Sequence, residues 1–140
     1  MTNMENNKAV IRRFLDEVIN QNRMDRADDL VVEDFVELDP LPGQRQAREG
    51  LKDVLGMMRV AFPDIHWVVE EMVAEGEKVV TQFTWTGTHR GSFLGVPATG
   101  KSVSVKGVVI DELAGGKMSA SRMLMDSLGI LQQPGVVPGA

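Results

Sequence analysis

The hydrophobic pattern of this chain changes period near its middle, and this change limits the possible folds more than any other feature. In the first half, apolar residues recur every three to four positions over about 8–19 and 48–61, which is typical of amphipathic helices. In the second half, apolar and polar residues alternate over 65–70, 79–86 and 102–110, which is typical of strands. Helices followed by antiparallel strands predict an α+β domain.

Turn and cap residues set the expected limits of these elements. Asn6 and Asn7 can cap the first helix. A short helical stretch over 26–32 leads into a brief strand over 33–39, which the prolines that follow bring to an end. Gly115 and Gly116 form the turn into a last strand, which we expect to run from residue 117 to about 128.

The length of the chain suits a single domain. It has 140 residues, of which 43% are apolar, enough to fill one hydrophobic core. We expect the core to span about 7–133, and the Pro- and Gly-rich 134–140 to form a flexible tail. The expected architecture is a cone: N-terminal helices pack on a strongly curved antiparallel sheet and leave an apolar pocket at its open end.

Composition excludes several classes of function. The formal charge of −5 lacks the basic footprint of a nucleic-acid-binding protein. Without Cys there are no disulfides or thiol nucleophiles, and two histidines are few for a transition-metal site. Tyr is also absent, so proton transfer must use Asp, Glu, His or Lys. With no apolar run of membrane-spanning length and a polar start, the sequence predicts a cytoplasmic protein without a membrane partner.

One motif points to a function that its context argues against. Residues 95–102, GVPATGKS, match the phosphate-binding loop pattern G-x-x-x-x-G-K-[ST]. That loop binds phosphate at the N-terminus of a helix, whereas the residues after it here are β-branched and alternate as in a strand. We therefore predict a connection between two antiparallel strands, and no nucleotide binding.

Several segments together resemble a known family. They are Ala61-Phe62-Pro63-Asp64, the Gly-Thr-His-x-Gly-x-Phe-x-Gly run at 87–95, Pro97-Ala98-Thr99-Gly100-Lys101, Gly116-Lys117 with Asp126, and the segment 131–135. Over about 7–135 the chain resembles the SnoaL-like polyketide cyclases, also called ester cyclases. The resemblance implies a ketosteroid-isomerase-like α+β cone, usually dimeric. It also implies cofactor-free, intramolecular aldol ring closure of a polyketide ester.

The resemblance also assigns roles to individual positions. Asp126 matches the acid/base carboxylate near the end of the last strand. Other positions depart from the family pattern: Glu112 stands where His or Arg is common, Leu38 where many relatives have His, Arg122 and Met125 where Trp is frequent, and Ala120 where an acidic residue is usual. The pocket of this chain therefore differs from that of its relatives.

The residues themselves support a site near Asp126. It follows the apolar stretch 123–125, and apolar surroundings can tune a carboxylate for proton transfer. Arg122 has the same strand parity, so it could bind a substrate carbonyl or neutralise a buried acid. A two-residue turn aligns Asp111 with the face of Arg122, and a three-residue turn aligns Glu112. The sequence leaves this open.

Other candidate residues have both a structural and a functional interpretation. His89 can hold a loop by hydrogen bonding or line the pocket, and His66 is expected to face solvent. Asp39 can cap a turn or form a pair of acids with Asp126. The aromatic residues and methionines, among them Trp85, Phe14 and Met58, can fill the core or form a pocket wall for a polycyclic ligand.

These features predict an enzyme that uses neither a cofactor nor a metal and acts on a small apolar carbonyl compound. Asp126 would transfer the proton during ring closure. Two alternatives remain: epoxide opening, hydrolysis or hydroxylation in the same pocket with Asp126 joined by Glu112 or Asp39, or a non-catalytic binding or dimerisation module. We expect a homodimer formed through the outer face of the sheet.

Overall fold

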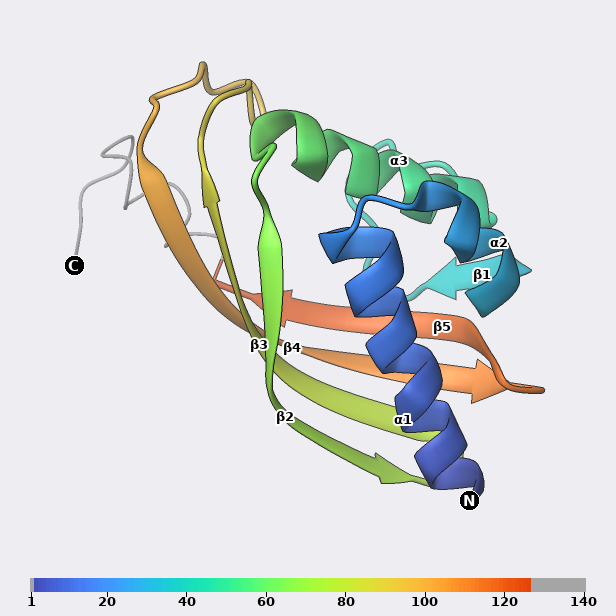
Figure 1. Cartoon of the computed structure of the whole chain (residues 1–140). Coiled ribbons are helices and arrows are strands. Elements are labelled where there is room, and N and C mark those ends of the chain that lie inside the picture. The colour runs from blue at the N-terminus through green and yellow to red at the C-terminus, as the bar shows by residue number, and fades with distance from the viewer. Residues whose placement is uncertain (1, 127–140) are drawn as a thin grey trace.

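A computed structural model describes residues 2–126 of the chain. The elements in chain order are α1 (Asn3–Arg13), the π-helix η1 (Phe14–Asn20), the 3-10 helix η2 (Met24–Arg26), α2 (Ala27–Leu30), β1 (Val31–Glu37), α3 (Ala47–Ala61), β2 (His66–Glu75), β3 (Lys78–Thr88), β4 (Ser102–Ala114) and β5 (Lys117–Met125). The helices lie on the concave side of one strongly curved sheet, as Figure 1 shows. The predicted α+β cone is confirmed.

The sheet is mixed, although we expected an antiparallel one. Its strand order is β1-β5-β4-β3-β2, in which β2 to β5 form the predicted antiparallel meander. The first strand, β1, pairs parallel with β5 at the edge of the sheet. Strand β1 precedes α3 in the chain, and the intervening helix lets it enter the sheet in the same direction as β5.

The first helix begins earlier than predicted. Thr2 caps it, and the Thr2 hydroxyl and the Glu5 carboxylate form a reciprocal capping box. Asn7, which we expected at the cap, is buried inside the helix. The helix continues directly into the π-helix η1, whose apolar side chains Phe14 and Val18 are buried.

The limits of two strands also differ from the prediction. Strand β1 ends at Glu37, and β5 ends at Met125, so Asp126 lies just beyond the strand rather than within it. The predicted end of the last strand at residue 128 and the tail 134–140 fall outside the described residues. The expected strand after the 95–102 motif is present, because Ser102 begins β4.

The core lies between the helices and the concave face of the sheet. Alternate residues of β3 are fully buried on this face, among them Phe83 and Trp85. The ring of Phe83 stacks on Trp67 with centroids 4.0 Å apart. On β4, a Cβ atom at Gly107 would lie 2.5 Å from the Phe83 ring, so only glycine leaves room for that ring.

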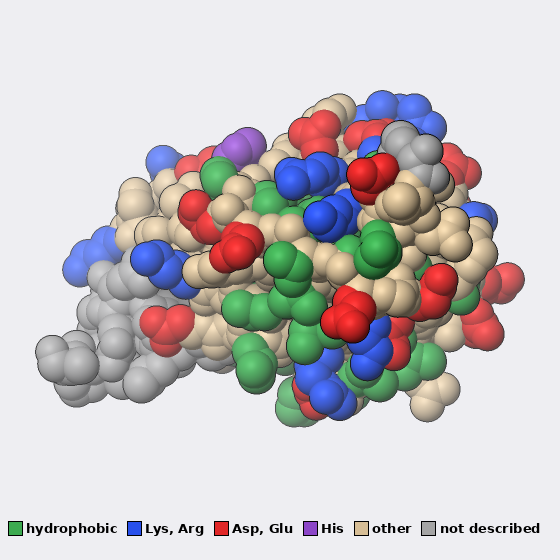
Figure 2. Space-filling view, turned by 90° about the horizontal axis from the view of Figure 1, so that it is seen from below, with side chains coloured by type: hydrophobic (Ala, Val, Ile, Leu, Met, Phe, Trp, Pro, Cys, Tyr) green, Lys and Arg blue, Asp and Glu red, His purple; other side chains and the backbone are tan. Residues whose placement is uncertain are grey.

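The convex face carries apolar side chains that nothing in residues 2–126 covers. Val108 on β4 lies opposite Leu124 on β5, and these residues are 38% and 72% exposed. Ile110 and Val73 extend the apolar surface on β4 and β2. Figure 2 shows a group of hydrophobic side chains, in green, on the underside of the molecule, bordered by charged residues.

Candidate active site

A β-bulge in the last hairpin decides which acid on β4 faces the interior. The hairpin has the two-residue Gly115-Gly116 turn, but Leu113 pairs with Met118 and Glu112 with Ala120, so Ser119 is an extra residue. Asp111 consequently lies opposite Ser121 on the concave face. The alternative that a two-residue turn places Asp111 on the face of Arg122 is wrong, because the bulge changes the parity of β5.

Asp111 is a buried acid among apolar neighbours. It is 2% exposed, and its side chain forms a hydrogen bond with the hydroxyl of Ser121. Burial raises the pKa of Asp111 from 3.8 to about 7, the Ser121 hydrogen bond lowers it, and the nearby Glu37 charge raises it. This carboxyl group can therefore hold or release a proton near neutral pH.

Glu37 provides a second acid in the same row of the sheet. It is the last residue of β1 and pairs with Ser121, which in turn pairs with Asp111. The three side chains thus lie side by side across β1, β5 and β4. Glu37 is half-buried, and burial is the main cause that raises its pKa. A hydrogen bond from the backbone N–H of Asp39, with an N–O distance of 3.4 Å, partly opposes that rise.

A cavity of about 510 Å³ adjoins Glu37. It lies between β1 and the segment that leads into α3, and its lining combines apolar, amide and charged side chains: Asp34, Phe35, Val36, Glu37, Pro40, Gln44, Arg45, Gln46 and Ala47. The wall depends on Gly50, because a Cβ atom there would lie 1.8 Å from the carbonyl oxygen of Arg45. Glycine lets this segment pack directly against the first turn of α3.

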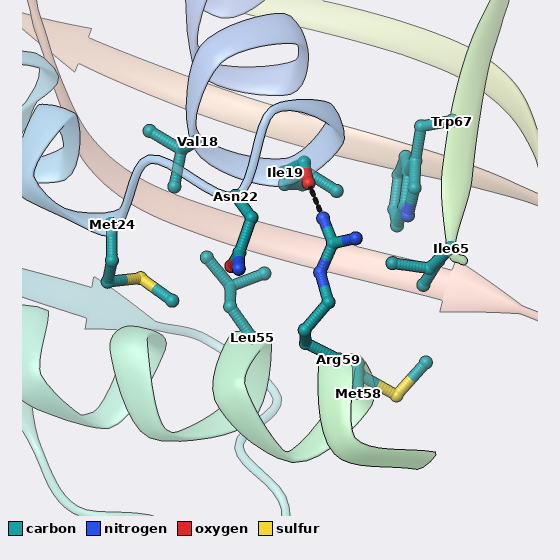
Figure 3. Close-up of a pocket in the computed structure, with 9 residues that line it drawn as sticks. All are labelled: Val18, Ile19, Asn22, Met24, Leu55, Met58, Arg59, Ile65 and Trp67. Carbon is teal, nitrogen blue, oxygen red and sulfur yellow. Dashed lines mark hydrogen bonds between the residues drawn. The ribbon is translucent and has the colours of Figure 1, made fainter. Parts of the chain in front are cut away.

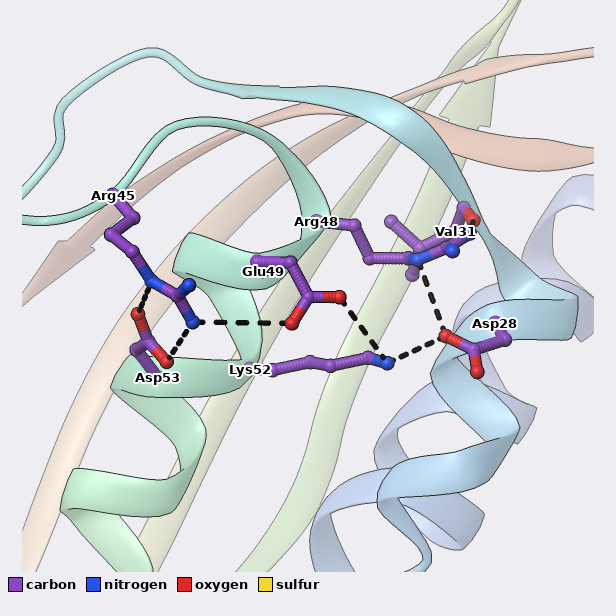
Figure 4. Close-up of polar contacts among 7 residues, drawn as sticks. All are labelled: Asp28, Val31, Arg45, Arg48, Glu49, Lys52 and Asp53. Carbon is purple, nitrogen blue, oxygen red and sulfur yellow. Dashed lines mark hydrogen bonds and ion pairs between the residues drawn. The ribbon is translucent and has the colours of Figure 1, made fainter.

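Charged side chains hold the cavity wall in place, as Figure 4 shows. Arg45 binds the Asp53 carboxylate through two nitrogens, at 2.6 and 2.8 Å. Asp28 on α2 binds Lys52 at 2.6 Å and lies 3.3 Å from Arg48 on α3. Arg48 also donates to the carbonyl oxygen of Val31 at the start of β1. Such exposed pairs add little stability, and their main effect here is to fix α3 against α2 and β1.

A second, smaller cavity lies between η1, α3 and β2 (Figure 3). Its volume is about 30 Å³, which is room for roughly one water molecule. Met58, which we expected in the core or in a ligand pocket, lines it. Arg59 crosses the cavity and donates to the carbonyl oxygen of Ile19. Trp67 also lines it, and its indole N–H has no hydrogen-bond partner within residues 2–126. This space is much smaller than the ligand pocket expected between the helices and the sheet.

Asp126, the last residue that the structure describes, is not buried as the sequence predicted. Its side chain is exposed, and its backbone N–H donates to the carbonyl oxygen of Lys106 at 3.1 Å, which continues the β4–β5 register. Because Met125 lies on the concave face opposite Gly107, this register directs Asp126 to the convex face. Its role as the acid/base residue stays a prediction from the family pattern.

Glu112, Arg122 and Asp39 also lie away from the interior. Glu112 is on the convex face, 3.8 Å from the amino group of Lys78. Arg122 pairs with the exposed Asp39 at 3.2 Å. Arg122 therefore forms this ion pair with neither Glu112 nor Asp111.

The remaining predicted site residues lie in a loop, in the core or on the surface. His89 is 2% exposed and shares a hydrogen bond with the Thr99 hydroxyl at 3.0 Å, which ties the two ends of the 89–99 loop together. Phe14 and Trp85 lie in the core and line neither cavity described above. His66 is exposed, as predicted.

Two further observations concern the described part of the chain. No group of three or more Asp, Glu or His side chains in residues 2–126 is arranged to hold a metal ion. None of the helices there has the length and apolar character needed to cross a membrane.

The fold, with acids in its interior, places this protein in the class of α+β cone proteins. Comparison with known proteins identifies the family. A family model described as SnoaL-like polyketide cyclase matches residues 9–134. The chain therefore belongs to the SnoaL-like polyketide cyclase family, as the sequence motifs indicated. A search of curated proteins found no match.

Solved structures with the same fold support this assignment. A candidate SnoaL-like polyketide cyclase from Jannaschia sp. CCS1 has 26% identity and a TM-score of 0.86, with 96% of this chain and 95% of that chain covered. IdmH, a candidate polyketide cyclase from Streptomyces antibioticus, has 25% identity and a TM-score of 0.82, with coverages of 93% and 99%. TsrD from Streptomyces laurentii, at 23% identity and a TM-score of 0.89 with coverages of 98% and 100%, shares the fold.

Proposed function

We propose that this protein is a cofactor-independent acid/base enzyme that closes a ring in a polyketide ester or a similar small carbonyl compound. The observation that carries the proposal is the carboxyl group of Asp111. It is buried and has a pKa of about 7, and it lies beside a second acid that lines a cavity. Membership of the polyketide cyclase family supports the same chemistry.

The proposed reaction needs only a base, an acid and a shaped cavity. A carboxylate removes a proton from a carbon flanked by two carbonyl groups, and the electron pair moves into an enolate. The enolate carbon attacks a second carbonyl of the same molecule, which forms the new carbon–carbon bond. The carboxylic acid returns its proton to the resulting alkoxide. Proton transfer of this kind contributes about 10²- to 10⁴-fold, and holding the chain in a reactive conformation contributes more.

Two parts of the molecule are candidates for the site of proton transfer. The family pattern favours Asp126, and the environment in this structure favours the acids on the concave face. An assay of ring closure on linear polyketide esters distinguishes these candidates. It compares the turnover of Asp111→Asn, Asp126→Asn and the convex-face control Glu112→Gln. We expect Asp111→Asn to lower turnover by about two to four orders of magnitude, and Glu112→Gln to change it less than about twofold.

The reverse result would reassign the base. If Asp126→Asn loses turnover by that amount and Asp111→Asn does not, Asp126 is the base and the ring-closing function stands. The proposal fails if the wild-type protein turns over none of the polyketide esters or related β-dicarbonyl compounds supplied. The control matters because Glu112 is the immediate neighbour of Asp111 on the same strand.

We also propose that the protein is a homodimer joined through the convex face of the sheet. The exposed apolar residues Val108, Ile110 and Leu124 lie on adjacent strands there and would be covered by a second copy. Sedimentation at micromolar concentration tests this, and a monomer of about 15 kDa, the mass of one chain, would contradict it.

A further inference from the structure

We propose that the cavity between β1 and the 40–47 segment binds the carbonyl end of the substrate, and that Glu37 is the catalytic residue that exchanges a proton with it while Asp111 holds a second proton behind it. This inference rests on the proposed acid/base function and names the site and the residue that meets the substrate.

The first argument is position. Asp111 is 2% exposed and lines neither of the two cavities described above, so a substrate in either of them would not touch it. Glu37 is half-buried and belongs to both groups: it lies in one row with Ser121 and Asp111, and it lines the 510 Å³ cavity. Glu37 is therefore placed to pass a proton between the buried acid and the cavity.

The second argument is charge. Glu37 and Asp111 are close enough for the charge on one to disfavour ionisation of the other. No Lys or Arg in residues 2–126 forms an ion pair with either. Asp39 lies beside Glu37 and is paired with Arg122. Ser121, which lies between Glu37 and Asp111, is neutral. Burial is the main cause that favours the protonated form of Asp111, and the negative charge of Glu37 adds to it.

The other charged groups at the cavity leave this balance in place. Asp34 lines the cavity and adds negative charge on β1 itself. Arg45 lines it as well, but its Nε and Nη2 atoms are bound by Asp53. The charge of Arg45 is thus balanced by Asp53. The surroundings of Glu37 therefore favour its protonated form.

The lining also indicates the chemical class of the substrate. Phe35 and Pro40 provide apolar surface, whereas Gln44, Gln46 and Arg45 provide N–H donors. The side-chain oxygen of Gln44 accepts from the backbone N–H of Leu41 at 3.0 Å, which leaves its NH₂ group as the donor. Donors near a base stabilise the oxygen on which enolate charge develops. The cavity fits a β-dicarbonyl compound with an apolar body.

Exchange of hydrogen for deuterium in ethyl acetoacetate tests the catalytic step directly. Glu37 takes a proton from the carbon between the two carbonyls, the electron pair forms the enolate, and a deuteron from D₂O returns by the same carboxyl group. Proton NMR follows the loss of the C2–H signal above the buffer rate. We expect Glu37→Gln to lower the enzymatic rate at least about 100-fold, and the matched control Glu112→Gln to stay within about twofold. A Glu37→Gln protein that keeps more than about a tenth of the wild-type rate overturns the inference.

A second measurement tests the carboxyl pair without any turnover. Carbon-13 NMR of labelled Glu and Asp side chains gives the titration curve of Glu37 in the wild-type protein and in Asp111→Asn. We expect the Asp111→Asn protein to lower the midpoint of Glu37, because a neighbouring acid that can become negative has been removed. An unchanged Glu37 curve overturns the inference whatever the activity.

The two measurements separate this inference from the proposed function. Ethyl acetoacetate that shifts the Glu37 signal in a saturable way, with coupled titration but no exchange, supports the binding site and contradicts the enzymatic function. Exchange that survives Glu37→Gln supports the function and contradicts the site. A ligand that shifts no signal of the cavity residues also contradicts the site.

Discussion

Asp111 and Glu112 are adjacent acids on one strand, and their surroundings have little in common. Asp111 lies on the concave face, is 2% exposed, and has its pKa raised to about 7. The Glu112 side chain lies on the convex face, is 39% exposed, and has the amino group of Lys78 3.8 Å away. The comparison teaches that the protonation of an acid on β4 depends on which face of the sheet it occupies. The extra residue Ser119 in β5 sets which β5 side chains share that face.

The two faces should differ most in how much stability the protein loses when a charged residue is introduced on each. Val109 on the concave face is 4% exposed, whereas Val108 beside it on the convex face is 38% exposed. We expect Val109→Asp to lower the free energy of unfolding by about 3–5 kcal/mol or to prevent folding, because it buries an unpaired carboxylate. Val108→Asp should cost less than about 1 kcal/mol. Urea unfolding followed by circular dichroism in dilute protein measures both, and equal losses would contradict the assignment of faces.

The next difference concerns association. On the convex face, Leu124→Glu puts a charge on the most exposed apolar residue of the proposed dimer surface, and we expect at least a tenfold weaker association. Val60→Glu on α3 is the matched control, since Val60 is 69% exposed and lies away from the sheet. Analytical ultracentrifugation over a range of concentrations compares them. A Leu124→Glu protein that associates like the wild type would place the dimer contact elsewhere.

The smallest effect should come from the convex-face acid itself. Glu112→Gln removes one exposed contact with Lys78, and exposed ion pairs stabilise proteins little. We expect the melting temperature to change by less than about 2 °C. Differential scanning calorimetry measures this change, and a shift of more than about 5 °C would show that Glu112 is not the inert neighbour that the comparison requires.

Much of the fold could be predicted from the sequence, because the hydrophobic period reports directly on secondary structure. Alternation in β3 identified Phe83 and Trp85 as inward-facing, and the Gly115-Gly116 turn located the last hairpin. The parallel pairing of β1 with β5 was missed because it joins segments that are far apart in the chain. Pattern alone shows that β1 is a strand and leaves its neighbour undefined.

The candidate site was harder to predict. The parity of β5 depends on the extra residue Ser119, and nothing in the local sequence marks that bulge. Asp111 was therefore only one of two alternatives, and Arg122, which could have neutralised Asp111 or Glu112, pairs with Asp39 instead. Glu37 was missed, although it shares its parity with the buried Phe35 in β1. That alternation is the signal that could have identified it as inward-facing.

The pH dependence of stability tests the central claim, a protonated acid on the concave face, most directly. The folded protein holds the Asp111 proton up to about pH 7, whereas the unfolded chain releases it near 3.8. Unfolding therefore releases a proton between these values, and the stabilisation is complete below about pH 4 and is lost as pH rises to about 7. This group should lower the free energy of unfolding by up to about 4 kcal/mol over that range, and burial of Glu37 adds to the same trend.

The measurement is urea unfolding between pH 4 and pH 8 for the wild type, Asp111→Asn and Glu112→Gln. We predict that the wild type and Glu112→Gln lose stability together as pH rises, and that Asp111→Asn shows a much flatter curve and becomes the most stable of the three at pH 8. Parallel curves for all three proteins would contradict the account, because Asp111 would then release its proton equally in the folded and unfolded states.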